Sequence, residues 1–219
     1  THSPIRVGMT PEWAPFSYVN AEGTPAGIDI DLLTLISQRT GLKFKLVPVE
    51  SWKDLRTLIK ESRVDVVTGI AETPRREETL LFTRPYFQSV VGIVTRESDR
   101  QFSHLALLRH ATLAMPRSYV TTTALTNRLP EARIILLDTA ADCLACVERH
   151  EPDATVVNLF ATTQYLNAHP RDKLSISGTV SEFEFPLRLG IRRDYPILST
   201  ILDQALASVT QQESDDIMS

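Results

Sequence analysis

One stretch decides the fold of this chain: Thr68-Gly69-Ile70-Ala71-Glu72-Thr73-Pro74-Arg75-Arg76-Glu77-Glu78. The apolar segment 64–67 precedes it and predicts a β-strand. Gly69 has no Cβ, so we expect a turn there whose backbone N–H and C=O groups face a small ligand. Ile70 and Ala71 follow in the same turn and join Gly69 as candidate ligand contacts.

The next residues predict the start of a short helix. Thr73 followed by Pro74 is typical of an N-cap and a first helical residue. The unpaired N–H groups of a helix start favour an anion. Arg76 lies three residues after the cap, and its planar guanidinium matches a carboxylate in two-point geometry. The alternative is a capped surface helix with solvated arginines, which are common.

Further along, the chain continues through Phe82-Thr83-Arg84-Pro85-Tyr86. Asp65, the glycine turn, Thr73-x-x-Arg76 and the 82–86 segment stand in one ordered run. This order resembles the core signature of the family 3 periplasmic solute-binding proteins. The resemblance implies an α/β, two-lobed, periplasmic-binding-protein-like fold (type II, Venus flytrap) with two hinge crossings. It also implies that Thr73 and Arg76 contact the ligand.

Composition bounds the class of protein. The chain has 219 residues, 42% hydrophobic and 23% charged, which is an ordinary globular balance. A net charge of −4 and a pI near 5.7 give no basic patch, so we expect no nucleic-acid partner. No apolar run reaches the roughly 20 residues of a spanning helix. The chain opens without a signal peptide, so it is either cytosolic or a trimmed piece of a longer protein. The resemblance favours the trimmed piece, and the helical pattern at 216–219 without a cap agrees with it.

The residues do not indicate a metal, a cofactor or a catalytic centre. Cys143 and Cys146 lie within a predicted helix, and we interpret them as small core residues. The five histidines are scattered, without metal or triad spacing. An enzyme on this fold would need a placed acid or base, for which Glu72 and Glu184 are candidates only by default. We therefore expect no cofactor and a domain that is not an enzyme.

Two tryptophans are candidate walls of a ligand pocket. Trp13 stands in a loop rich in prolines and aromatics, residues 10–18, which either packs on its own core or forms a ligand platform. The resemblance places an aromatic cover at Trp13 and a second wall at Trp52. A core role for Trp52 stays open beside it. Asp29 and Asp31 open a helix after Gly27, and we interpret both as structural partners of the helix dipole.

Hydrophobic periodicity predicts the remaining elements as alternating strands and helices, hence a mainly parallel sheet covered on both faces. The expected strands are 5–9, 43–49, 64–67, 87–95, 111–115, 133–137, 154–157, 174–176 and 187–191, and the expected helices begin or run at 28–36, 52, 118–129, 139–149, 159–168 and 195–209. By the resemblance, residues 1–94 and 188–219 form lobe 1 and residues 95–187 form lobe 2. We expect the helix 195–209 to pack back on lobe 1.

Lobe 2 is expected to supply three ligand contacts: Ser118, Tyr119 and Asn158. Ser118 is a suitable N-cap for the helix that follows, and Tyr119 would fill part of the pocket. Amino-acid binders of the family carry Asp at the position of Asn158, where it takes the ligand's ammonium. The uncharged Asn158, and Ala71 in place of a hydroxyl residue, count against an amino acid. A helix cap is the alternative role of Asn158.

The last third of the chain resembles the flytrap domains of Bvg-type virulence sensor kinases, which are membrane-anchored hybrid histidine kinases. The resemblance implies a periplasmic sensor domain that binds a small anionic or amino-acid-like molecule. It also implies a membrane span and cytoplasmic kinase modules in the full-length chain, for which it allows a homodimer. The alternative is a free solute-binding protein of an ABC transporter.

Overall fold

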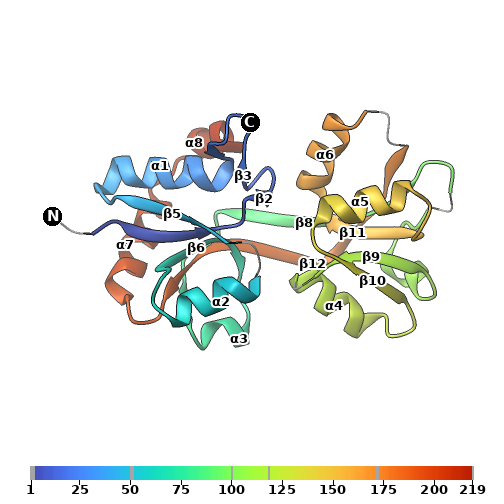
Figure 1. Ribbon diagram of the computed structural model, residues 1–219, viewed down its shortest axis with the longest axis horizontal. Helices are drawn as coiled ribbons and strands as arrows, with labels where there is room; N and C mark the ends of the chain where they lie inside the picture. Colours follow the sequence, from blue (N-terminus) through green and yellow to red (C-terminus); the bar gives the residue numbers. More distant parts are fainter. Residues whose placement is uncertain (1–2, 50–51, 100, 118, 171–172, 219) are drawn as a thin grey trace. The chain divides into compact units, whose positions relative to one another are not determined.

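The computed structural model describes residues 3–49, 52–99, 101–117, 119–170 and 173–218, without the side chains of Glu12, Trp52, Lys53, Glu182 and Glu184. The chain forms two compact units: unit 1 comprises Thr1–Gln88 and Pro186–Ser219, and unit 2 comprises Ser89–Phe185. Two strands pass from one unit to the other, β8 (Phe87–Arg96) and β12 (Leu174–Arg192) (Figure 1). The two units are divided at 88/89 and 185/186, a few residues before the crossings expected at 94/95 and 187/188.

The sheet of unit 1 has the strand order β12-β6-β1-β5, with β7 also paired to β12. Its strands besides β12 are β1 (Ile5–Met9), β5 (Phe44–Pro48), β6 (Val66–Ala71) and β7 (Leu80–Phe82). β1 pairs in parallel with both β5 and β6, while β12 runs antiparallel to β6 and β7. The carboxyl ends of β1 and β6 therefore open on the same edge of the sheet, the usual ligand edge of an α/β fold.

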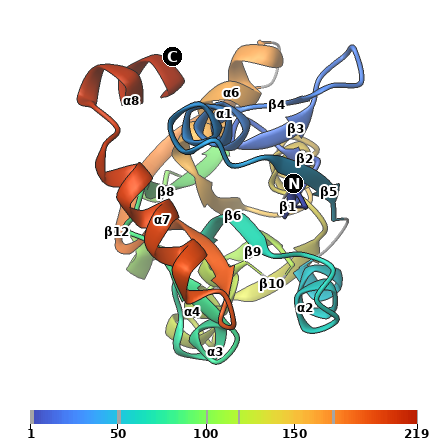
Figure 2. The ribbon, with the colours of Figure 1, turned by 90° about the vertical axis from the view of Figure 1, so that its left-hand side faces the viewer.

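Helices cover both faces of this sheet. They are α1 (Ile28–Thr40), α2 (Trp52–Lys60), α3 (Pro74–Glu77), α7 (Pro196–Ala207) and α8 (Gln211–Met218), and a small antiparallel sheet adds β2 (Glu12–Trp13), β3 (Ser17–Val19) and β4 (Pro25–Ala26). α7 and α8 both contact α1 (Figure 2). Leu202 and Leu206 of α7 pack with Leu32 and Ile36 of α1 in one core, and α2 closes the other. The expected return of the chain to unit 1 through the helix after residue 195 is confirmed.

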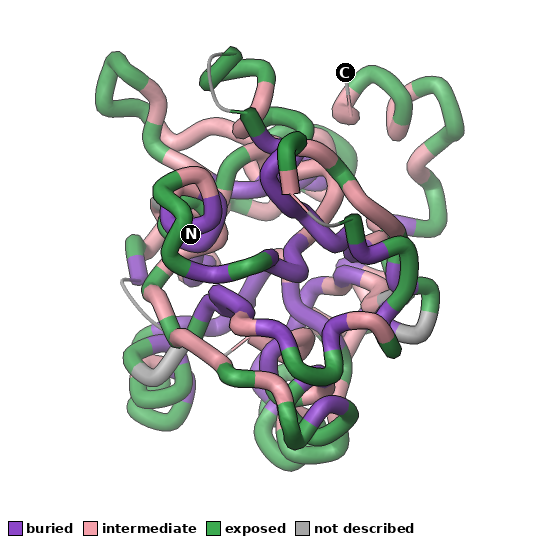
Figure 3. The backbone as a smooth tube through the Cα atoms, turned by 90° about the vertical axis from the view of Figure 1, so that its right-hand side faces the viewer, coloured by how far each residue is buried: buried purple, intermediate pink, exposed green. Residues whose placement is uncertain are grey.

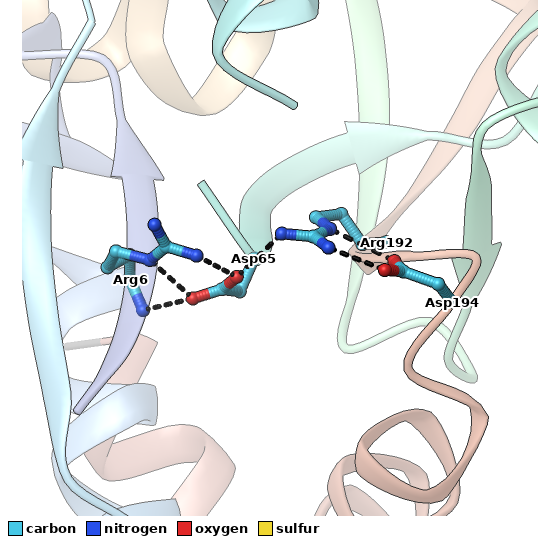
Figure 4. Close-up of polar contacts among 4 residues, drawn as sticks. All are labelled: Arg6, Asp65, Arg192 and Asp194. Atoms are coloured by element: carbon cyan, nitrogen blue, oxygen red, sulfur yellow. Dashed lines mark hydrogen bonds and ion pairs between the residues drawn. The ribbon is translucent and has the colours of Figure 1, made fainter. Parts of the chain in front are cut away.

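A partly buried ionic network holds the opposite edge of the sheet. Asp65, just before β6, accepts from the guanidinium of Arg6 at 2.6 Å and forms an ion pair with Arg192 at 3.2 Å. Arg192 reaches Asp194 in turn at 2.5 Å (Figure 4). Three strand ends, those of β1, β6 and β12, are thereby joined by alternating charges. Asp65, part of the signature stretch, is thus a structural residue.

The sheet of unit 2 has the order β10-β9-β11-β8, with β12 next to β8. Its strands besides β8 are β9 (Thr112–Pro116), β10 (Arg133–Leu137) and β11 (Ala154–Asn158). β9 pairs in parallel with β10 and β11, and β8 runs antiparallel to β11. The expectation of a mainly parallel sheet was therefore only partly right: the strands that alternate with helices pair in parallel, but β8 and β12 run antiparallel to their neighbours and make the sheet of each unit mixed.

Helices on both faces of this second sheet are α4 (Val120–Arg128), α5 (Ala140–Glu148) and α6 (Leu159–Ala168), with a short 3-10 turn, η1 (Leu105–Leu108). Among the described residues, buried ones concentrate in the strands and exposed ones in the outer helices and loops. Figure 3 colours the backbone tube by this residue burial. Cys143 and Cys146 are buried within α5, and burial raises the pKa of the Cys143 thiol to about 12. Their interpretation as core residues is confirmed.

Three expectations about secondary structure were wrong. β12 is one strand of 19 residues, where two short strands were expected. Pro186 lacks an N–H and argues for a break, but β12 continues past it along β6 and β7. The predicted helix 195–209 ends at Ala207, and α8 follows as a separate helix. α4 has Tyr119 at its N-cap position, in place of the expected cap Ser118, and residue 118 lies outside the described part.

Candidate functional site

The site is built around Gly69, which lies inside strand β6 instead of in a turn after it. Its φ is +61°, a conformation that costs side-chain-bearing residues energy. A Cβ at this position would lie 2.1 Å from a ring carbon of Trp13. The pairing of β6 with β12 shifts register opposite this point, between Arg188 and Gly190. Only glycine therefore lets the Trp13 ring lie directly on the β6 backbone.

The N–H of Gly69 is already used within the protein, so the expectation that it faces a ligand was wrong. It donates to the hydroxyl of Tyr86 at 2.7 Å, and that hydroxyl donates to Asp29 Oδ1 at 2.6 Å. Asp29 is fully buried in the first turn of α1. Its second oxygen, Oδ2, makes no hydrogen bond of normal geometry within the described residues. Asp29 is thus linked to the β6 backbone through the Tyr86 hydroxyl. This role goes beyond that of a helix-dipole partner.

Burial sets the electrostatics of this pair. Desolvation raises the pKa of Asp29 to about 6, and the hydroxyls of Tyr86 and Thr68 only partly offset it. The pKa of Tyr86 is raised well above its usual value, first by burial and then by the neighbouring Asp29. At neutral pH the hydroxyl therefore keeps its proton and can donate to the carboxylate.

Arg76 occupies the position that the sequence predicted, in the short helix α3. Thr73 is its N-cap residue and Pro74 its first helical residue, as expected, although the Thr73 side chain makes no capping bond. The Thr73 carbonyl accepts instead from the N–H of Arg76, at 2.9 Å. Arg76 Nη1 donates to the Ala71 carbonyl at 2.6 Å. The guanidinium is thus anchored directly to the end of β6.

Burial lowers the pKa of Arg76 to about 10, so it remains a cation at neutral pH. The neighbouring Arg75 is exposed, which distinguishes the two arginines. Ile70 and Ala71, the other backbone candidates, are both buried. A partly desolvated cation at the carboxyl end of a parallel strand is suited to bind an anion.

The aromatic loop packs tightly beside this backbone. The rings of Trp13 and Phe16 lie 4.5 Å apart, and Phe16 meets Phe87 edge-on at 4.9 Å. Trp13 remains partly exposed, whereas Phe16 is buried. Trp13 therefore covers Gly69 on one side and keeps a surface that a ligand can contact. Trp52 begins α2, and its side chain lies outside the described part.

Glu72, named above as a default catalytic carboxylate, forms an ion pair with Arg188 at 3.1 Å. Arg188 also donates to the Thr83 carbonyl at 2.7 Å. The side chain of Glu184 lies outside the described part. Within the described residues, no cluster of three or more His, Cys, Asp or Glu could hold a metal ion.

Two of the three candidate residues of unit 2, Asn158 and Tyr119, make their described contacts within the unit itself. Asn158 Oδ1 accepts from the N–H of Ala161 and caps α6, while its Nδ2 donates to the hydroxyl of Ser89 at 2.8 Å. Burial raises the pKa of Tyr119 to about 12, with Cys143 of α5 as a neighbour. The capping role left open for Asn158 is therefore confirmed, and Tyr119 lies against α5.

Sequence reasoning missed Asp29, Tyr86 and Ser89 as parts of the site. Tyr86 stood in the signature stretch without a role, and Asp29 was interpreted as a dipole partner. A signal existed for Asp29, because a carboxylate two residues after a helix-leading glycine falls on the apolar side of α1 with Leu32 and Leu33. No local pattern pointed to Ser89.

The fold and site define a two-lobed α/β binding protein of the flytrap class. The model of the bacterial extracellular solute-binding proteins, family 3, matches residues 5–218, so the chain belongs to this family. Both the resemblance and the fold class predicted from the sequence are confirmed. Among the described residues, no helix is long and apolar enough to cross a membrane.

Relatives of two kinds are similar to this chain. The virulence sensor protein BvgS of Bordetella bronchiseptica is 27% identical over 218 residues, covering 100% of this chain. The chain spans only 18% of that protein's length. The crystal structure of the Bordetella pertussis BvgS periplasmic VFT2 domain matches with a TM-score of 0.87 at 26% identity, covering 98% of this chain and 91% of that one. A "Probable amino-acid ABC transporter-binding protein" of Haemophilus influenzae is 25% identical, covering 79% of this chain and 66% of that protein.

Proposed function

We propose that this chain is the ligand-sensing flytrap domain of a membrane-bound sensor histidine kinase of a two-component system, and that it lies in the periplasm. The observation that carries the proposal is the similarity of the whole chain to a small part of BvgS, a virulence sensor protein. On this proposal a membrane span and cytoplasmic kinase modules belong to the same full-length protein, which can form a homodimer.

The ligand that we propose is a small carboxylate bound at Arg76 of unit 1. Arg76 supports this class, because its guanidinium is partly desolvated, protonated at neutral pH and anchored to the Ala71 carbonyl. A partly desolvated cation favours a ligand that supplies the opposite charge. Trp13 supplies an apolar surface beside it. The proposed ligand contacts also include Gly69 through its carbonyl, Thr73, and the unit 2 residues Ser118 and Tyr119.

The side chain of Asn158 favours a carboxylate without an ammonium group over an amino acid. In amino-acid binders of the family the equivalent position carries an Asp that takes the ammonium. Here the residue is uncharged, and both ends of its amide are bonded to Ala161 and Ser89. An ammonium placed there would meet no opposite charge and would lose its hydration.

Signalling would follow from linkage between ligand binding and lobe arrangement. A ligand that binds one arrangement more tightly shifts the population toward it, by no more than the difference in binding free energy. α7 and α8 follow β12, contact α1 and are the last elements of the chain. They are the proposed route by which the shift reaches the membrane.

The second candidate is a free solute-binding protein that delivers an amino acid or another small solute to an ABC transporter. The similarity to the Haemophilus influenzae protein favours it. The two functions make different predictions for the gene. A stop codon within a few residues of Ser219, beside transporter genes, would contradict the sensor and support the transporter protein.

The ligand proposal is tested by native mass spectrometry of the purified chain, followed by calorimetry with the molecule retained. Arg76→Ala should weaken binding of that molecule by about 2–5 kcal/mol, because the ligand's carboxylate is left without its partner. Arg75→Ala is the matched control, since Arg75 is the exposed neighbour in the same helix. Equal affinity of the Arg76 and Arg75 variants would show that the carboxylate does not bind at Arg76.

A further inference from the structure

Unit 1 contains a pocket of about 180 Å³ on the side of α1 that faces α7 and α8. α1, the junction of α7 with α8, and the Pro85-Tyr86 segment enclose it. Its wall includes Ile28, Leu32, Tyr86, Val209, Ser214 and Ile217. Of residues 69–76, which carry the unit 1 part of the proposed ligand site, none lines it.

The lining favours a neutral molecule with both apolar and polar groups. No charged side chain is among the described residues that line the pocket, and an ion brought there would lose hydration without gaining an opposite charge. Two of its polar side chains are already engaged, Thr210 with Glu213 and Gln211 with Asp215, each at 2.8 Å. Ser214 adds one further hydroxyl. The pocket can therefore satisfy a ligand with about one hydrogen-bonding group.

The volume of the pocket suits a single aromatic ring that carries a polar group. An enclosed apolar cavity of about 150 Å³ is enough to bind benzene, whereas this pocket is slightly larger, partly open, and exposes polar as well as apolar surface. Tyr86 and Met218 are both among the residues on its wall. Aromatic rings pack favourably against other rings and against methionine sulfur.

The helix that covers the pocket is fixed in place without filling it. The Arg39 guanidinium donates to Ser208 at 2.8 Å and to Glu213 at 2.5 Å, which ties α8 to α1. The Thr210 N–H donates to Glu213 in addition, at 2.9 Å. No described residue of α8 is buried. Hydrogen bonds and ion pairs therefore hold α8 in place over the pocket. Because none of its described residues is buried, the helix does not fill the pocket.

Tyr86 joins the pocket to the site around Gly69. The residue lines the pocket, and its hydroxyl accepts from the Gly69 N–H and donates to Asp29. A molecule that binds in the pocket contacts Tyr86 and shifts its hydroxyl, which accepts the hydrogen bond from the Gly69 N–H of β6. The two places are thus connected through one side chain, over two hydrogen bonds.

We propose that this pocket is a second binding site, for an uncharged molecule of about one aromatic ring. We further propose that a molecule bound there changes the hydrogen bond between Tyr86 and the Gly69 N–H. The site goes beyond the proposed carboxylate sensor and does not need Arg76. A cytoplasmic or membrane partner is not required for it either, because the whole wall belongs to unit 1.

Phenol is the probe, because it has one ring and one hydroxyl and is neutral at pH 7. In a ¹H–¹⁵N NMR titration of the 219-residue chain, phenol should shift the amide signals of the first turn of α1, of residues 209–214 and of Gly69. Gln211→Phe should abolish these shifts by filling the pocket. Gln212→Phe is the matched control: Gln211 and Gln212 are both exposed and each bonds an Asp four residues on, but only Gln211 lines the pocket.

Each outcome of the titration supports or overturns a stated part of the proposal. Arg76→Ala should keep the phenol shifts, so a failed carboxylate site leaves this result intact. No shift at the pocket amides in the wild-type chain, or unchanged shifts in both Gln211→Phe and a second filling variant, Ser214→Phe, would overturn the site. Pocket shifts without a Gly69 shift would overturn the coupling through Tyr86. Shifts confined to residues 69–76 would place phenol at the carboxylate site and also overturn the proposal.

Discussion

The hydroxyl of Tyr86 lies 2.6 Å from Oδ1 of Asp29, a residue 57 positions earlier, and donates its proton to a fully buried carboxylate. The same hydroxyl oxygen accepts the N–H of Gly69. One phenol group thus fixes the first turn of α1 to the strand that carries the proposed ligand site.

Tyr86→Phe removes this hydroxyl and keeps the ring. We expect a loss of about 1–3 kcal/mol in the free energy of unfolding, because a buried carboxylate and a backbone N–H both lose a partner. Urea denaturation measures it. Tyr195→Phe is the control, since Tyr195 is 41% exposed, and should cost much less. Equal losses in the two variants would contradict the buried role of the Tyr86 hydroxyl.

Asp29 should make stability fall as pH rises from about 4 to about 6. Its pKa is raised from 3.8 to about 6 in the folded protein, so within this window the folded state binds more protons than the unfolded state. Between about pH 4 and neutral pH, Asp29 therefore lowers the free energy of unfolding by about 3 kcal/mol. In Asp29→Asn this component is absent.

The measurement for Asp29 is the difference in unfolding free energy between wild type and Asp29→Asn, taken at several pH values. Carboxylates with lowered pKa values, such as Asp203 and Asp194, make stability rise with pH. Their contributions are the same in both proteins and cancel in the difference. A difference that does not change between about pH 4 and pH 7 would rule out a raised pKa for Asp29.

Gly69→Ala should destabilise the protein for two reasons that a control separates. The positive φ costs alanine about 1–2 kcal/mol, and the Cβ would lie 2.1 Å from the Trp13 ring. Gly23 also has a positive φ, but a Cβ added there would meet nothing within 4 Å. Thermal unfolding should therefore show a clearly larger loss for Gly69→Ala than for Gly23→Ala, and equal losses would exclude the contact with Trp13.

Asp65→Asn should cost about 2–4 kcal/mol, because two arginines, Arg6 and Arg192, lose their shared carboxylate. Burial alone would raise the pKa of Asp65, but the hydrogen bonds from Arg6 hold it below its usual range. Glu61→Gln is the control. Glu61 pairs with Arg63 at 3.6 Å on the exposed surface, where such pairs contribute little. The network is unimportant to stability if both variants unfold alike in urea.

Local features of the sequence were enough to predict much of this fold. The strand 5–9 was predicted to the residue, and Gly41 ends α1 in the left-handed conformation that a helix terminus favours. Thr73-Pro74 began α3 as expected. Each of these depends on residues within a few positions, where backbone conformation and capping decide the outcome.

Contacts between distant segments decided the rest. The continuous β12 depends on pairing with β6 and β7, which overrides the local effect of Pro186. The boundary between α7 and α8 coincides with a tether from Arg39, 169 positions before Ser208. Periodicity along the chain carries no information about such partners.

The candidate site divides in the same way. The sequence by itself determined the family, the two-lobed class and the place of Arg76, because the signature residues lie in one short stretch whose order fixes a strand and a helix start. Only the tertiary structure decided that the Gly69 N–H is used by Tyr86, that Asp29 is buried beneath it, and that Asn158 is bonded on both sides. Hydrogen-bond partners and desolvation depend on which segments meet in space, and no local rule contains that information.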